Sequence, residues 1–143
     1  MPGLDIGIDL GTYSIKFFAR KKGIILSEET AICYDTFTGD AVAIGNSAGQ
    51  MLDRLPESLV LKCPIEGGVV SDFTAMTQIL SHFIKEVCKN RIFRPNLIIS
   101  APCCVTSLEK KTIIEAACAA GAGKVHITDE PIVSAIGAGL SIE

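Results

Sequence analysis

Alternating apolar and polar positions open the chain and predict short β-strands. Residues 6–10 and 14–20 alternate on either side of Gly11-Thr12, and residues 23–27 follow the tight turn Lys21-Lys22-Gly23. A period of two is typical of half-buried strands, and turns this short join antiparallel neighbours. The first thirty residues therefore predict an antiparallel meander of three strands.

Shorter apolar runs, separated by polar loops, follow this meander. They predict a small α+β segment inserted between the meander and the rest of the chain. The elements expected there are strands over 31–34, 41–44 and 59–63, a short helix over 47–54 capped by Asn46, and a turn over 64–68.

Helical periodicity replaces strand alternation after residue 72. Apolar residues at i, i+3, i+4, i+7 and i+11 predict an amphipathic helix that begins near Asp72 or Thr74. Its stripe consists of Met76, Ile79, Leu80, Phe83 and Val87. The elements expected next are a buried parallel strand over 96–101, a helix opened by a capping box at Thr106 to Glu109, a strand over 124–128 and a helix from Ile132.

The order of elements predicts an α/β fold. Without the insertion it is three strands followed by helix-strand-helix-strand-helix, a mixed sheet with helices on its faces. We expect residues 1–31 and 73–143 to form this core and residues 32–72 to form an inserted subdomain. Ligands of open sheets bind at the edge where the connections change direction. The Gly11 turn and Asp129-Glu130 should therefore meet at one edge.

Composition narrows the classes of function. The chain has 143 residues, a hydrophobic fraction of 48%, a mean hydropathy of +0.41 and a net charge of −3, so nucleic acid is not an expected partner. Six cysteines lack metal-binding spacing, and we expect them to be reduced core residues of a cytoplasmic protein. Neither a signal peptide nor an apolar run of about 20 residues is evident.

The first hairpin carries the strongest candidate chemistry. Asp9 can hold a hydrated Mg²⁺, and Lys16 can reach a phosphate. The backbone N–H groups and hydroxyls of Thr12, Tyr13 and Ser14 can surround an anion beside Gly11. The same residues also fit an ordinary hairpin turn between apolar strands, and spacing alone leaves both interpretations open.

Two segments resemble a known family. Gly7-Ile-Asp-Leu-Gly-Thr12 and Asp129-Glu-Pro-Ile-Val-Ser-Ala-Ile-Gly-Ala-Gly139 are similar to motifs of the actin/DnaK/sugar-kinase ATPase superfamily, and most similar to those of MreB-type bacterial actins. Residues 22–28, 64–72 and 116–125 support the resemblance. It implies a ribonuclease-H-like core, and it implies that the chain corresponds to an N-terminal half, which by itself should bind ATP weakly and hydrolyse it negligibly.

The resemblance also implies roles for individual residues. The hairpin residues Gly11, Thr12, Tyr13 and Ser14 would contact the β- and γ-phosphates of ATP, and Asp9 would act on Mg²⁺ through water. Glu130 would orient the attacking water, although it also fits a carboxylate that merely stabilises a helix N-terminus. Four residues depart from the MreB pattern. Tyr13-Ser14 replace Ala-Asn, Asp129 replaces Glu, and Lys16 instead matches the phosphate-binding lysine of eukaryotic actin.

A basic and apolar segment matches the membrane loop of the family. Ile92 and Phe93 would enter the bilayer, flanked by Lys89, Arg91 and Arg94. The alternative is that both apolar side chains plug the domain's own core. The resemblance further implies filaments beneath the cytoplasmic membrane, cell-wall synthesis and morphogenesis proteins as partners, and a role in cell shape. A DnaK-type chaperone and a small-molecule kinase are the alternative functions.

Overall fold

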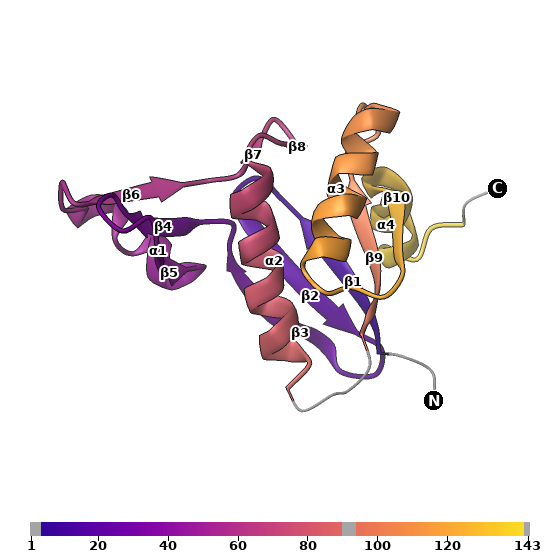
Figure 1. Ribbon diagram of the computed structural model, residues 1–143. Coiled ribbons are helices and arrows are strands. Elements are labelled where there is room, and N and C mark those ends of the chain that lie inside the picture. The colour runs from indigo at the N-terminus through magenta and orange to yellow at the C-terminus, as the bar shows by residue number, and fades with distance from the viewer. Residues whose placement is uncertain (1–3, 90–93, 142–143) are drawn as a thin grey trace.

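A five-stranded mixed sheet forms the centre of the computed structural model, which describes residues 4–89 and 94–141 (Figure 1). The strand order is β10-β9-β1-β2-β3. The neighbours β1, β9 and β10 are parallel, whereas β2 is antiparallel to both β1 and β3. The predicted α/β class and meander are confirmed. The strands are β1 (Asp5–Leu10), β2 (Ser14–Ala19), β3 (Gly23–Glu29), β9 (Asn96–Ala101) and β10 (Val125–Asp129).

Three helices flank this sheet unequally. Helices α2 (Phe73–Val87) and α3 (Ser107–Ala119) pack side by side on one face, and α4 (Glu130–Gly137) lies on the other face against β9 and β10 (Figure 1). The side chains of α2 and α3 bury one face of the sheet, which is apolar. Most of the opposite face is left open.

Alternation along the strands separates a buried face from a polar face. In β1, Ile6, Ile8 and Leu10 are buried, whereas Asp5 and Asp9 are exposed. The stripe predicted on α2 is buried over its first four members, and the edge of the Phe17 ring meets Phe83 with 6.2 Å between centroids. The expectation that β9 is buried on both faces is wrong, because α4 covers only part of the open face and Ile98 remains 50% exposed.

Both long helices begin at the residues that local pattern predicts. The side chain of Asp72 accepts a hydrogen bond from the N–H of Ala75 at 2.9 Å, and Thr106 and Glu109 form a reciprocal capping box. The Ala75 N–H and the ammonium of Lys62, 2.7 Å away, hold the pKa of the Asp72 carboxyl below its usual value. Asp72 thereby joins strand β6 of the insertion to the start of α2.

The inserted segment forms its own small sheet, with strand order β5-β4-β6, and a β7–β8 hairpin. The predicted cap at Asn46 is wrong: Gly45 occupies that position with φ 73°, and the Asn46 side chain instead accepts a hydrogen bond from the N–H of Glu29. The turn expected over 64–68 is the β7–β8 hairpin. The elements are β4 (Ile32–Asp35), β5 (Ala41–Ile44), α1 (Asn46–Gly49), η1 (Leu52–Arg54), β6 (Leu59–Lys62), β7 (Ile65–Glu66) and β8 (Val69–Val70).

The cysteines are mostly outside the core, contrary to expectation. Cys33 is buried, and its burial raises the pKa of its thiol. The exposed cysteines lie in loops or on the outer face of α3, where no neighbouring element covers them; they are Cys63, Cys103, Cys104 and Cys118. Within residues 4–89 and 94–141, no helix has the length and apolar character needed to cross a bilayer.

The contact between α2 and the sheet predicts where stability is concentrated. Phe83→Ala should lower the free energy of unfolding by about 3–5 kcal/mol, because it empties a buried site against Phe17. Phe73→Ala, at a 43% exposed position of the same helix, is the matched control and should cost less than half as much. Urea denaturation followed by circular dichroism measures both. Equal losses would contradict the packing described here.

Candidate functional site

The turn between β1 and β2 is held by a short backbone contact. The N–H of Gly11 donates a hydrogen bond to the carbonyl oxygen of Ser14 at 3.0 Å. A Cβ added at Gly11 would lie 2.8 Å from that oxygen, closer than real Cβ atoms approach. The backbone angle φ of Gly11 lies outside the left-handed region, so close approach rather than backbone angle requires glycine here.

Thr30 fixes this turn from behind. It is buried, its hydroxyl donates to the carbonyl oxygen of Gly11 at 2.9 Å, and its N–H donates to the carbonyl of Tyr13 at 3.1 Å. The carbonyls of the turn are thereby directed inward to Thr30. The Tyr13 side chain is 87% exposed. In the part of the chain that the structure describes, the N–H groups of Thr12 and Tyr13 donate to no other residue.

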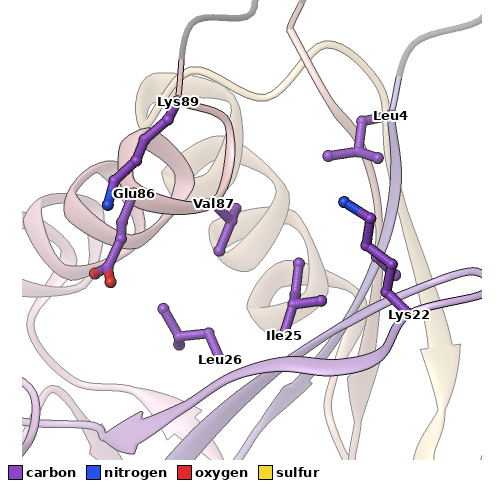
Figure 2. Close-up of a pocket in the computed structure, with 8 residues that line it drawn as sticks. Leu4, Lys22, Ile25, Leu26, Glu86, Val87 and Lys89 are labelled. Carbon is purple, nitrogen blue, oxygen red and sulfur yellow. The ribbon is translucent and has the colours of Figure 1, made fainter.

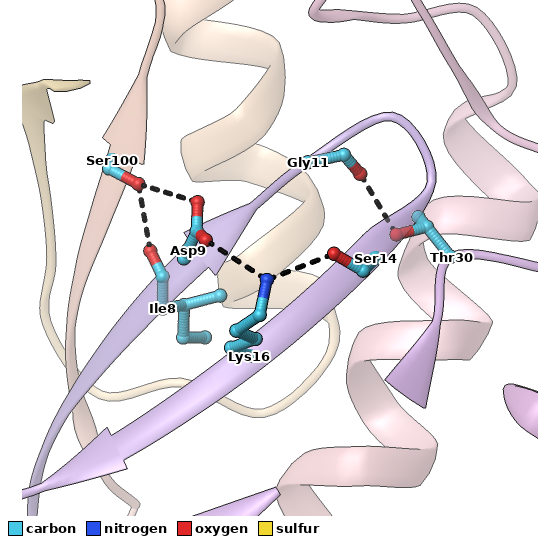
Figure 3. A network of polar contacts seen from close by, with 7 residues as sticks. All are labelled: Ile8, Asp9, Gly11, Ser14, Lys16, Thr30 and Ser100. Atoms are coloured by element: carbon cyan, nitrogen blue, oxygen red, sulfur yellow. Dashed lines mark hydrogen bonds and ion pairs between the residues drawn. The ribbon is translucent and has the colours of Figure 1, made fainter. Parts of the chain in front are cut away.

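Charged and hydroxyl groups from three strands meet beside the turn (Figure 3). The ammonium of Lys16 lies 3.6 Å from a carboxylate oxygen of Asp9 and donates to the hydroxyl of Ser14 at 3.0 Å. Ser100 donates weakly to the other Asp9 oxygen at 3.5 Å and to the carbonyl of Ile8 at 3.4 Å. Strand register explains the meeting, since Asp9 is paired with Lys16 on one side and with Ser100 on the other.

Glu130 reaches the same region from the far end of the chain. Asp9, Ser100 and Glu130 line one cavity of about 230 Å³, together with Val133 and Ser134 of α4. The two predicted acidic positions therefore meet at one sheet edge, as the order of elements predicts. Their carboxylate oxygens are ligands that a hydrated Mg²⁺ accepts, so the donor set fits this ion.

Asp129, next to Glu130, has a different contact. Its carboxylate pairs with the ammonium of Lys110 on α3 at 3.0 Å and does not cap α4. Because Asp129 occupies the N-cap position, this ion pair ties the start of α4 to the opposite face of the sheet. Glu130 is the first residue of that helix, so Lys110 helps to hold the backbone that carries it.

An apolar hollow continues from the polar site along the open face. Its volume is about 310 Å³, and Phe18, Ile24 and Ile98 supply much of its wall. Asp9, Lys16 and Ser100 border it at the polar end. The site thus offers carboxylates for a hydrated cation, an ammonium and free N–H groups for an anion, and an adjoining apolar surface.

The structure places Lys89 and Arg94, two further predicted site residues, at the other end of the sheet. Lys89 follows α2 and Arg94 precedes β9, and both are exposed. Arg91, Ile92 and Phe93 lie outside the described residues. Neither Lys89 nor Arg94 lines the cavity beside Asp9.

Sequence reasoning missed Thr30, Ser100 and Lys110. The signals for the first two were weak: Thr30 is a polar residue between two strands, and Ser100 is a hydroxyl in an otherwise apolar strand. Lys110 had no local signal, because its partner Asp129 lies 19 residues further along the chain.

The strand order, the glycine turn beside an aspartate and the acidic start of α4 together define an actin-type domain of the ribonuclease-H-like class. The family model described as MreB/Mbl protein matches residues 3–143. The chain belongs to the MreB/Mbl family.

Individual relatives agree with this assignment. Mbl, the cell shape-determining protein of Bacillus subtilis strain 168, is 39% identical over 139 residues, and MreB of Escherichia coli K12 is 35% identical over 144 residues. Each alignment covers 96% of this chain but only 42% of the relative. The chain therefore spans about two fifths of the length of these proteins.

Solved structures show the same fold. MreB5 of Spiroplasma citri bound to ADP superposes with a TM-score of 0.88 at 25% identity, covering 97% of this chain and 42% of that one. A double helical filament of MamK gives a TM-score of 0.79 at 17% identity, covering 95% and 43%, and so supports the fold alone.

The hairpin geometry makes a prediction that two glycines can test. Gly11→Ala should destabilise the chain by about 1–3 kcal/mol, because the new methyl group collides with the Ser14 carbonyl and strains the turn. Gly7→Ala, in the preceding strand β1, is the matched control, since its Cβ would lie an ordinary 3.7 Å from Phe18. Thermal unfolding of both variants provides the comparison. An equal change would show that the turn tolerates a side chain.

Proposed function

We propose that this chain is the part of a cell-shape-determining bacterial actin that binds the phosphates of ATP-Mg²⁺, in a protein that assembles into filaments at the cytoplasmic membrane and directs cell-wall synthesis. Asp9 and Glu130, 121 positions apart in sequence, line a single cavity beside the Gly11 turn, and this observation carries the proposal. The nucleotide-bound structures of Spiroplasma citri MreB5, with ADP and with AMPPNP, support it.

Each group at the site has a chemical task in this proposal. When bound, ATP-Mg²⁺ supplies the phosphoryl group that is transferred to water. The free N–H groups of Thr12 and Tyr13, with Gly11 and Ser14, receive phosphate oxygens. Asp9 would bind the water molecules around the Mg²⁺ ion. Lys16, whose ammonium contacts Asp9 and Ser14 in this structure, would supply positive charge to the phosphates.

Glu130 is the group placed to act on the attacking water. Phosphoryl transfer depends mainly on positioning and on charge stabilisation, and a carboxylate can orient a water molecule by accepting its hydrogen bond. Glu130 is exposed at the start of α4 and lines the cavity beside Asp9. The Lys110–Asp129 ion pair holds the preceding residue in place.

Assembly and nucleotide turnover are proposed for a longer protein. The described chain supplies one wall of the site, and its relatives continue well beyond the aligned region. Assembly is proposed because the chain belongs to the MreB/Mbl family, and MamK, which shares the fold, has been solved as a double helical filament. A chaperone or a small-molecule kinase would use a similar site without forming filaments.

Extending the chain through the missing portion of its relatives allows the proposal to be tested. Sedimentation with ATP-Mg²⁺ should pellet filaments visible by electron microscopy. Glu130→Ala should still assemble but should release phosphate about 10²–10⁴-fold more slowly, because the water is no longer oriented. Glu115→Ala, on the outer face of α3, is the matched control and should hydrolyse normally.

The results separate the candidate classes. A soluble monomer that turns over ATP would move the assignment to the kinase or chaperone class. Normal phosphate release by Glu130→Ala would show that Glu130 has no role in hydrolysis and serves only as a carboxylate at the start of a helix.

We also propose that the segment from Lys89 to Arg94 contacts the inner face of the cytoplasmic membrane. The support is its sequence, in which Ile92 and Phe93 stand between basic residues. Burial of both apolar side chains would contribute about 3–6 kcal/mol at most, so one molecule would bind only marginally and a filament would bind through avidity.

Removing the apolar pair tests this contact. Ile92→Ser with Phe93→Ser should abolish sedimentation of the extended protein with anionic vesicles while leaving its melting temperature unchanged. Phe37→Ser with Leu108→Ser removes two exposed apolar side chains elsewhere and should retain vesicle binding. A large loss of thermal stability in the first variant would instead show that Ile92 and Phe93 plug the core.

A further inference from the structure

Thr30 places a hydroxyl where packing alone does not require one. Of the polar and charged residues that the structure describes, only Thr30 is fully buried, with 1% of its surface exposed. A buried hydroxyl is costly unless it forms a hydrogen bond, and valine has the same shape without a polar atom. The Thr30 hydroxyl forms its bond with the carbonyl oxygen of Gly11, 19 residues earlier in the chain. The polar atom therefore serves the β1–β2 turn.

This hydrogen bond also decides where the N–H of Thr12 points. The Gly11 carbonyl and the Thr12 N–H belong to one planar trans peptide unit, so they point in opposite directions. Because the carbonyl is directed inward to Thr30, the Thr12 N–H is directed away from it (Figure 3). A reversed peptide would present a carbonyl oxygen to an anion and repel it.

The backbone of Thr30 holds the other end of the turn. Its N–H donates to the carbonyl oxygen of Tyr13 at 3.1 Å. Thr30 thus occupies the carbonyls of two turn residues, while in the described part of the chain the N–H groups of Thr12 and Tyr13 have no protein acceptor. A turn whose acceptors are used and whose donors are free is suited to an anion.

Contacts with the inserted segment fix the residues on both sides of Thr30. The N–H of Glu29 donates to the side-chain oxygen of Asn46 at 2.9 Å, and the N–H of Gly45 donates to the carbonyl of Ala31 at 2.8 Å. Gly45 and Asn46 form the start of α1. Thr30 is therefore held in place before any ligand arrives, and donors that are already oriented avoid the cost of ordering on binding.

We propose that Thr30 is a positioning residue of the phosphate site. Its hydroxyl orients the Gly11–Thr12 peptide so that the Thr12 N–H donates to a phosphate oxygen. The inference rests on the nucleotide binding proposed above and identifies the side chain that sets how tightly the turn holds phosphates. Thr30 acts through the turn and requires no contact with the nucleotide.

Calorimetry of the extended protein with ATP-Mg²⁺ tests this role. Thr30→Val should weaken binding about 10–100-fold, the factor that a hydrogen bond to a charged group contributes. Thr30→Ser keeps the hydroxyl and should bind like the native protein. In phosphate release, Thr30→Val should raise KM and leave kcat nearly unchanged, because the lost bond is made in the ground state and the transition state alike. Glu130→Ala should lower kcat instead.

The opposite end of the sheet, where β1, β9 and β10 begin, supplies the controls. Exposed cations from separate connections lie there and could attract phosphates by charge alone. They are Arg20, Lys21, Lys22, Lys89, Arg94 and Lys124. A cavity of about 280 Å³ at this end is lined by Lys22, Ile25 and Val87, and by the acidic Glu86 (Figure 2). Lys22→Gln removes one of these cations, and Ile25→Val reduces packing in the strand that leads to Thr30. Both variants should bind ATP-Mg²⁺ like the native protein.

Adenosine, which carries no phosphate, separates positioning from general damage. Its binding should be unchanged in Thr30→Val, and in the 143-residue chain this variant should shift the amide NMR signals of Thr12 and Tyr13 but not that of Val87. Native affinity of Thr30→Val for ATP-Mg²⁺ would overturn the inference. So would weak binding by Thr30→Ser, or equal losses of adenosine and ATP-Mg²⁺ binding in Thr30→Val. Failure of the native extended protein to bind ATP-Mg²⁺ would instead reject the proposed function and this inference with it.

Discussion

The pairing of β1 with its two neighbours is the interaction on which the rest of the structure depends. Its register places Asp9 opposite Lys16 on the antiparallel side and opposite Ser100 on the parallel side. Because successive side chains in a strand point to opposite faces, the same register sends Ile8 and Leu10 into the core. A slip of one residue would bury Asp9 and expose the apolar set. Core and site are therefore specified by one set of hydrogen bonds.

The two faces of the sheet are covered unequally, and this explains why one contributes stability and the other carries the candidate site. Helices α2 and α3 bury one face and provide most of the apolar contacts, including those of Phe83. Of the helices that the structure describes, only α4 packs on the other face, which keeps Asp9, Lys16 and Ser100 accessible beside an apolar hollow. The face buried by α2 and α3 therefore provides most of the packing stability, whereas the open face carries the polar groups of the candidate site.

The two edges of the sheet have opposite electrostatic character. Asp9 and Glu130 line one cavity where β1 and β10 end, beside the hairpin. Cations occupy the edge where these strands begin. The right-handed crossover connections of a parallel sheet place every helix start at one edge and every helix end at the other. Helix dipoles then favour anion chemistry at the first edge and tolerate positive charge at the second.

Local signals predicted the features that depend on neighbouring residues. The caps at Asp72 and Thr106 and the buried stripe of α2 were predictable, because each is decided within one or two helical turns. Asn46 shows the limit of such signals: its type suits a helix cap, but a contact with Glu29, 17 residues earlier in the chain, takes its side chain. Gly11 lies in the turn that the sequence predicts, but only the structure shows that the Ser14 carbonyl excludes a side chain there.

The sequence by itself determined the class and order of the main elements, three strands followed by helix-strand-helix-strand-helix, and the chemical types present at the hairpin and at Glu130. These follow from periodicity and turn chemistry over a few residues. Only the tertiary structure decided that Asp9 and Glu130 line one cavity, that Ser100 and Thr30 support the site, and that cations from separate connections form one edge. Such meetings depend on strand order and register between residues far apart in the chain, and no local pattern encodes either.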